Sequence, residues 1–219
     1  MDLDDDVKGA ATARALETPV TLAIEGEICD ATLRDVRDGL QQARDAKQTR
    51  LVLEIASDGG SVYACLGIID VLREWLDEDA SRELVTFATH AFSAACVLFG
   101  VGTTRVASPL STFMNHACSG GLEGEVNRMA QQLQEAERVN ALCDAQLAAS
   151  IGENATRLLC ESGEKYVDAA TALDIGLATH VGHVRARVDV VVQVAEAVRA
   201  GAPSSRKRRR AAHGARAAP

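Results

Sequence analysis

The chain has 219 residues, a length that suits a single domain with a sizeable core. Hydrophobic residues make up 47% and charged residues 25%, whereas aromatic residues reach only 3%, which argues against a base-stacking nucleic-acid surface. The formal net charge of −8 is unevenly placed, with acidic residues gathered at 2–6 and a basic run at 206–210.

These patterns divide the chain into a polar segment over 1–18, one domain over 19–200 and a basic tail over 201–219. We expect the tail to be disordered, as like-charge blocks usually are, with nucleic-acid binding or sorting as the alternatives. The longest apolar stretch, around 91–102, is too short to span a bilayer, and the N-terminus has no secretory signal pattern. We therefore expect a cytoplasmic protein with no membrane partner.

The six cysteines contain no C-x-x-C pair. In a chain without a secretory signal, this spacing predicts reduced thiols that mostly fill the core, rather than a disulfide framework or a zinc site. His180 and His183 are three residues apart, but they have no Cys or carboxylate partner at a suitable spacing. We therefore predict no metal.

Alternating apolar residues and helical spacing predict the elements in chain order. These are a strand at 19–28, a helix at 31–46, a strand at 50–56, a helix at 61–76, a strand at 83–89, a helix of small residues beginning near Ser93, and two short strands around a proline turn in 104–116. The regular alternation predicts mostly parallel strands joined by right-handed crossovers.

The longest predicted helix runs from Leu122 to Ser150. Its apolar positions step by four and three alternately, with Asn140 as the one polar member, which indicates a seam packed on its own domain or on a partner. Residues 162–182 follow as a loop, a short helix stopped by Gly176 and a last strand, and 184–200 can add one further element.

Two features fall at the carboxyl ends of parallel strands, where sites usually form. Gly59 and Gly60 follow the second strand, and Ser93 follows the third at the start of a helix. Backbone N–H groups in such turns can stabilise an oxyanion, because the start of a helix carries unpaired donors and a positive partial charge. The alternatives are a plain tight turn and a serine that merely caps its helix.

Four blocks together resemble the Clp protease proteolytic subunit, within the Clp/crotonase fold. In order they are "IASDGGSVYACLGIIDVL", "HAFSAACVLFGVG", "FMNHACSGG" and "EKYVDAATALDIGLATHV", and the resemblance covers roughly residues 19–182. It implies an α/β fold: a repeated β-β-α superhelical spiral with mostly parallel strands and a projecting long helix.

The resemblance also implies the roles of single residues. Ser93 matches the nucleophile and His116 the general base, while Glu164 matches the position of the acid, where the family normally has Asp. Gly60 and Ala94 match the two backbone donors of the oxyanion hole.

Two further assignments stay open, with Asp168 as the alternative acid and His90 as a lower-ranked base. The family further implies a peptide or unfolded protein as substrate, assembly into a homo-oligomeric ring, and no cofactor. An ATP-driven unfoldase is a possible partner, although the family's N-terminal contact segment has no counterpart in residues 1–19.

The sequence thus predicts a serine endopeptidase that works through an acyl-enzyme on Ser93. Two alternatives remain: a catalytically silent ring subunit, favoured by the altered residues around Ser93 and by Glu at position 164, and a crotonase-like acyl-CoA hydratase or isomerase.

Overall fold

The computed structural model describes residues 20–160 and 163–184. The predictions for 1–18, for 185–200 and for the basic tail lie outside these residues. The strands are β1 (Val20–Ile28), β2 (Arg50–Gly60), β3 (Glu83–Phe92), β4 (Thr104–Asn115), β5 (Lys165–Asp168) and β6 (His180–Val181). The helices are α1 (Asp30–Asp45), α2 (Val62–Asp77), α3 (Ala94–Phe99), α4 (Val126–Ile151), α5 (Glu153–Cys160) and α6 (Ala169–Asp174).

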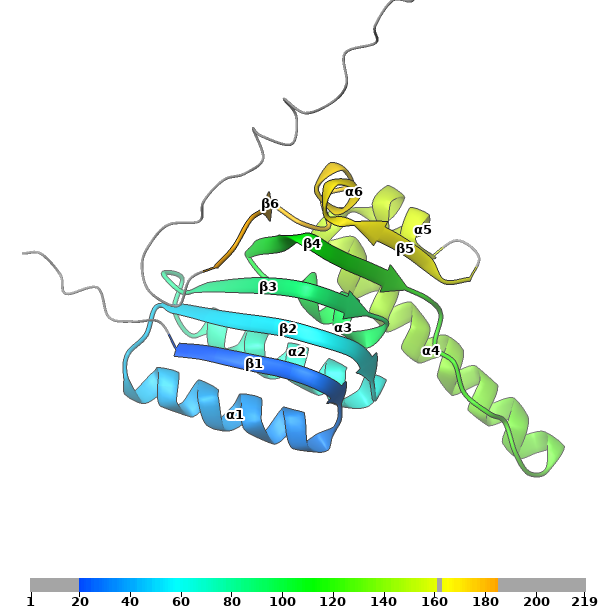
Figure 1. The fold of residues 1–219 in the computed structure, drawn as a ribbon. Coiled ribbons are helices and arrows are strands. Elements are labelled where there is room, and N and C mark those ends of the chain that lie inside the picture. Colours follow the sequence, from blue (N-terminus) through cyan, green and yellow to red (C-terminus); the bar gives the residue numbers. More distant parts are fainter. Residues whose placement is uncertain (1–19, 161–162, 185–219) are drawn as a thin grey trace, which may run out of the picture.

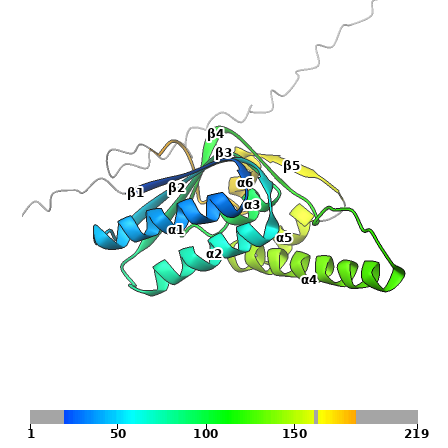
Figure 2. The same cartoon turned by 90° about the horizontal axis from the view of Figure 1, so that it is seen from below.

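The strands form one sheet in the order β1-β2-β3-β4-β5, with β6 pairing β4. The first four strands are mutually parallel, and β5 runs antiparallel to β4. Helices α1, α2 and α3 cover one face of this sheet (Figure 1, Figure 2). The expected α/β class with mostly parallel strands is confirmed.

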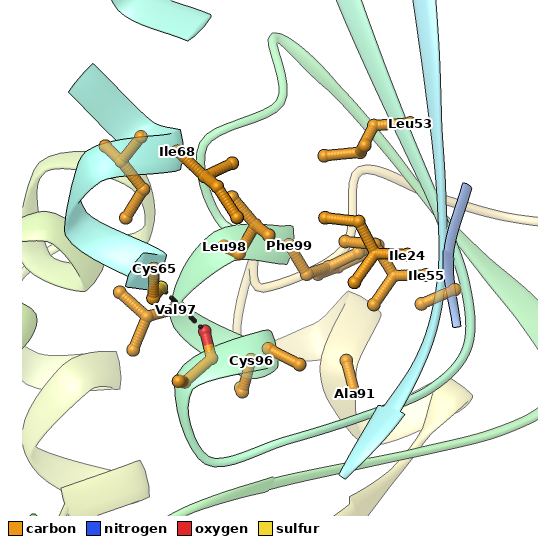
Figure 3. Close-up of a cluster of buried hydrophobic side chains, with 14 of the residues drawn as sticks. Ile24, Leu53, Ile55, Cys65, Ile68, Ala91, Cys96, Val97, Leu98 and Phe99 are labelled. Carbon is orange, nitrogen blue, oxygen red and sulfur yellow. Dashed lines mark hydrogen bonds between the residues drawn. The ribbon is translucent and has the colours of Figure 1, made fainter. Parts of the chain in front are cut away.

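The main core lies between the sheet and these helices. Ile24, Leu53 and Ile55 project from β1 and β2 toward Leu98 and Phe99 of α3 (Figure 3). All five side chains are almost completely buried, so each removes apolar surface from water worth about 1.5–3 kcal/mol. This packing fixes α3 against the carboxyl half of the sheet. The N-terminus of α3 forms part of the candidate site.

The prediction of two short strands around Pro109 is wrong in part, because β4 is one continuous strand from Thr104 to Asn115. The proline instead interrupts the pairing between β4 and β3. Ala107 pairs with Ala88 of β3, and the next paired residue is Thr112, opposite His90. Proline has no N–H to donate to a ladder, so the chain bulges here without ending the strand.

Helix α4 projects beyond the sheet (Figure 1). Only the C-terminal part of its predicted seam is buried in this chain, at Cys143 and Leu147. Val126 is 75% exposed and Leu133 is 50% exposed. The projecting half of the helix therefore presents apolar side chains that its own domain does not cover.

Arg105 ties the C-terminal part of the fold to β4. Its guanidinium donates to the carbonyl oxygens of Leu177 at 2.8 Å and of Gly102 and Gly176 at 3.0 Å each. Partial burial lowers the pKa of Arg105 from its ordinary value, yet the carbonyl acceptors compensate for much of the lost hydration. The side chain thus connects the ends of α3 and α6.

Candidate active site

Ser93 sits in a sharp turn between β3 and α3. Its backbone angles are φ 54° and ψ −125°, a conformation that costs a non-glycine residue about 1–3 kcal/mol and that clusters at functional sites. Ser93 occupies the N-cap position, but its hydroxyl makes no capping hydrogen bond. The serine therefore does not act as a helix cap, and its hydroxyl is available for another role.

The same turn is attached to the strand that carries His116. The N–H of Ser93 donates to the carbonyl oxygen of Met114 at 2.8 Å. Met114 lies two residues before His116, which directly follows the last residue of β4. The half-buried ring of His116 is thus brought to the end of the sheet where Ser93 lies.

Gly59 lies directly against Ser93 because Gly59 carries no Cβ. A Cβ on Gly59 would come within 2.8 Å of the Phe92 carbonyl oxygen and 2.9 Å of the Ser93 Cβ. The two glycines have φ values of +104° and +144°, which side-chain-bearing residues rarely adopt. The buried hydroxyl of Ser57 accepts from the N–H of Gly59 at 3.1 Å and donates to the carbonyl of Gly26. These two hydrogen bonds connect the turn to β1.

One cavity of about 280 Å³ is lined by Gly60, Ser93, Ala94 and His116. The structure therefore brings together the predicted nucleophile, base and both oxyanion donors. Ala94 is the first residue of α3, so its N–H has no acceptor within the helix. No hydrogen bond joins the Ser93 hydroxyl to the His116 ring, and catalytic contacts of this kind often tighten only in the substrate complex.

Glu164 does not line this cavity. The antiparallel register pairs Asn115 with Lys165, so one step further along the two chains sets Glu164 across from His116. Its carboxylate accepts a hydrogen bond from the Tyr166 hydroxyl at 3.1 Å rather than from the histidine. The predicted acid is thus placed next to the base in register, without a contact to it.

Asp168, the alternative acid, is engaged elsewhere. It pairs with Thr112, further back along β4, and its carboxylate accepts from the N–H of Thr171 at 2.8 Å as the N-cap of α6. Hydrogen bonding to the Thr171 side chain, and then to its backbone N–H, lowers the pKa of Asp168 from its ordinary value. Asp168 therefore acts as a helix cap in this structure.

His90 lies away from the cavity. It alternates along β3 with Ala91, which is buried in the core, and its Nε2 is 3.6 Å from Asp58 Oδ1. Its ring packs against Phe92 at 5.5 Å between centroids, and Phe92 in turn contacts Tyr166. His90 therefore belongs to an aromatic row on the opposite face of the sheet.

Sequence reasoning missed much of the cavity wall. Tyr63 lines it from α2, and Asn140, Cys143 and Asp144 line it from α4. The Tyr63 hydroxyl donates to Glu135 on α4 at 3.1 Å, which joins the two helices. The one available signal was Asn140, a polar residue in an otherwise apolar seam.

Metal-binding clusters and membrane-spanning helices are absent from the described part of the chain. Within 20–160 and 163–184, no three His, Cys, Asp or Glu side chains gather as a metal would require. The His180 ring nitrogen Nδ1 is hydrogen-bonded to the Thr179 hydroxyl at 2.9 Å. Among the described helices, none is both long and apolar enough to cross a membrane.

A mostly parallel α/β sheet with a strained serine at a strand–helix turn, beside a histidine and a double-glycine turn, is an arrangement typical of serine hydrolases. The family model for Clp protease matches residues 8–185 of this chain. The chain therefore belongs to the Clp protease family.

Curated relatives agree with this family assignment. The chain is 30% identical over 166 residues to ATP-dependent Clp protease proteolytic subunit 3 of Rhodococcus jostii (strain RHA1), covering 74% of this chain and 80% of the relative. It is 27% identical over 165 residues to proteolytic subunit 2 of Corynebacterium jeikeium (strain K411), covering 71% and 75%. The resemblance inferred from the four blocks is thereby confirmed.

Proposed function

We propose that this protein is a serine endopeptidase that cleaves peptide bonds through an acyl-enzyme on Ser93. The observation that carries the proposal is the single cavity shared by the strained Ser93, His116 and the turn at Gly60. A hydroxyl, an imidazole and backbone donors are the groups that acyl transfer requires, and their convergence comes from three separate strand ends.

In the proposed reaction, His116 takes the proton of the Ser93 hydroxyl as the oxygen attacks the substrate carbonyl. The N–H groups of Gly60 and Ala94 stabilise the oxyanion, and one such donor is worth about 10²–10³ in rate. His116 then gives its proton to the leaving amine, and water hydrolyses the ester by the same steps. Glu164 orients the histidine once its carboxylate turns from Tyr166 to the ring.

Assembly and partners are part of the same proposal. The relatives are named as subunits of ATP-dependent proteases, which supports assembly with further subunits and dependence on ATP. Our proposal extends this to a homo-oligomeric ring in the cytoplasm that is coupled to an ATP-driven unfoldase. The exposed apolar residues of α4, including Val126 and Leu133, offer a surface for ring contacts. The expected substrates are peptides and unfolded proteins that enter the ring.

Covalent labelling tests the nucleophile. A fluorophosphonate probe should label Ser93, and Ser93→Ala should abolish both labelling and hydrolysis of a fluorogenic peptide. Ser119→Ala is the matched control, because it removes a hydroxyl from the same cavity wall and should leave labelling intact. An assembled, folded protein that resists labelling would instead support the silent ring subunit, and acyl-CoA binding by calorimetry would support the crotonase-like alternative.

Substitution of the histidine tests the base. His116→Ala should lower peptide hydrolysis by about 10²- to 10⁴-fold, because that is the usual contribution of general-base catalysis. The circular dichroism spectrum should not change, since the ring is only half-buried and lies after the end of β4. Full activity in this variant would remove His116 from the mechanism.

A further inference from the structure

Two cysteines from different parts of the chain line the cavity that holds Ser93. Cys118 lies in the segment between β4 and α4, which has neither helix nor strand at this point, and Cys143 lies on α4. The N–H of Cys118 donates to the Asn140 side-chain oxygen at 3.0 Å. Asn140 and Cys143 are three residues apart and share one face of the helix, so this hydrogen bond brings the Cys118 backbone to the turn of α4 that carries Cys143.

Both thiols line the same cavity, and each one influences the pKa of the other. A disulfide needs Cβ atoms about 3.5–4.5 Å apart and sulfurs about 2 Å apart, so the segment of Cys118 has to bring its thiol to Cys143. Cys118 is exposed and belongs to an irregular segment, which can supply that movement. Cys143 is held by the buried face of α4.

The other cysteines have different surroundings. Cys65 and Cys96 are completely buried in the main core, where the Cys65 thiol donates to the carbonyl of Ala94 at 3.2 Å (Figure 3). The Cys160 thiol donates to Asp144 and accepts from Asn115, so its bonding is satisfied locally. In the described part of the chain, Cys118 and Cys143 are the two cysteines that line this cavity, and Cys118 is exposed to solvent.

We propose that Cys118 and Cys143 form a reversible disulfide by exchange with a low-molecular-weight disulfide of the glutathione type. The Cys118 thiolate attacks one sulfur of the reagent, forms a mixed disulfide and releases one thiol. The Cys143 thiolate then attacks the Cys118 sulfur and releases the second thiol. Overall, two protein thiols are oxidised, one reagent disulfide is reduced to two thiols, and two protons pass from protein to reagent.

The surroundings set the order and the rate of these steps. Burial raises the pKa of Cys143 to about 12, and burial together with the nearby Asp144 carboxylate raises the pKa of Cys118. The thiolate is the attacking species, so the exchange is slow at neutral pH and accelerates as the pH rises. Cys118 reacts first because it is the exposed member of the pair.

The disulfide has a consequence for the site. His116 lies only two residues before Cys118, and both side chains line the cavity with Ser93. Joining Cys118 to α4 draws this segment across the cavity and fixes it there. Oxidation therefore lowers peptide hydrolysis, an effect that rests on the proposed function, whereas the disulfide itself does not.

Thiol mapping tests the disulfide. The reduced full-length protein is incubated at pH 8 with oxidised glutathione, the remaining thiols are alkylated, and tryptic peptides are analysed by mass spectrometry. Because Arg128 and Arg138 lie between the two cysteines, a bond appears as two peptides linked by Cys118 and Cys143. Cys118→Ser and Cys143→Ser should each abolish the link, and Cys160→Ser, the matched control, should keep it.

Three results would overturn the disulfide: a persistent glutathione adduct on Cys118, a bond between Cys143 and Cys160, or six alkylated thiols after prolonged oxidation. Hydrolysis of a short peptide is measured on the same samples. We expect oxidation to lower the rate at least tenfold, dithiothreitol to restore it, and the Cys118→Ser rate to be insensitive to oxidised glutathione. A mapped disulfide with an unchanged rate would refute the effect on the site, and a reduced protein without any hydrolysis would count against the proposed function alone.

Discussion

Replacement of Gly59 by alanine should damage both the stability and the activity of the protein. At φ +104° a side-chain-bearing residue is strained, at a cost of about 1–3 kcal/mol. The new Cβ would also lie 2.8 Å from the Phe92 carbonyl oxygen, 2.9 Å from the Ser93 Cβ and 3.2 Å from the Ala94 nitrogen. Two of these are backbone atoms that cannot swing aside, so overpacking adds about 1–3 kcal/mol. We expect a total loss of about 2–6 kcal/mol in the free energy of unfolding.

Gly152→Ala is the matched control. Gly152 has φ +83°, and a Cβ there would meet nothing within 4 Å. It should therefore show the strain of about 1–3 kcal/mol without the overpacking. Urea unfolding followed by circular dichroism measures both variants under the same conditions.

The difference in activity should be larger than the difference in stability. Displacing Ser93 or the Gly60 turn by about 1 Å is enough to cost about 10²-fold in rate. Peptide hydrolysis at a temperature where both variants are folded should therefore fall about 10²-fold in Gly59→Ala and stay near the wild-type rate in Gly152→Ala. Equal stability and equal activity of the two variants would refute the close approach of Gly59 to Ser93.

Three further substitutions test other parts of the structure. Glu164→Gln should lower peptide hydrolysis more than Asp168→Asn, which should mainly lower the thermal midpoint through the weakened cap of α6; the opposite ranking of hydrolysis rates would make Asp168 the acid. Arg105→Lys keeps the charge but cannot reach all the carbonyl acceptors, so urea unfolding should show a loss of about 1.5–3 kcal/mol, and wild-type stability would contradict this role. Hydrogen bonds from Arg44 and Arg82 lower the pKa of Glu78 to about 2. The stability from this carboxylate is present above about pH 4.5 and is lost as the pH falls toward 2. Glu78→Gln should therefore flatten the pH dependence of the free energy of unfolding in that window. Outside the window, the curves of the variant and the wild type should run parallel.

Local pattern determined most of the elements. Alternation over 19–28 and helical spacing over 31–46 and 61–76 agree with β1, α1 and α2 within one or two residues at each end. These segments each bury one face, and one-sided burial is what produces a readable period along the chain. Their parallel order followed from the alternation of strands and helices.

Features that depend on pairing between strands were not determined locally. Pro109 indicates a turn when its neighbours alone are considered, but pairing with β3 and β5 on either side keeps β4 continuous. The heptad pattern of α4 likewise gave no sign that Val126 is exposed while Leu147 is buried. What covers an apolar residue depends on elements far away in the sequence.

The candidate site also has features that local sequence determines and features that depend on distant elements. The sequence by itself determined that Ser93 starts a helix after a strand and that two glycines follow the neighbouring strand, because backbone geometry restricts which residues occur there. Only the tertiary structure decided that His116 shares a cavity with Ser93 and that Cys118 and Cys143 line the same cavity. These contacts join residues separated by whole strands or helices, and their distances are set by the packing of the sheet against α3 and α4 rather than by any local preference.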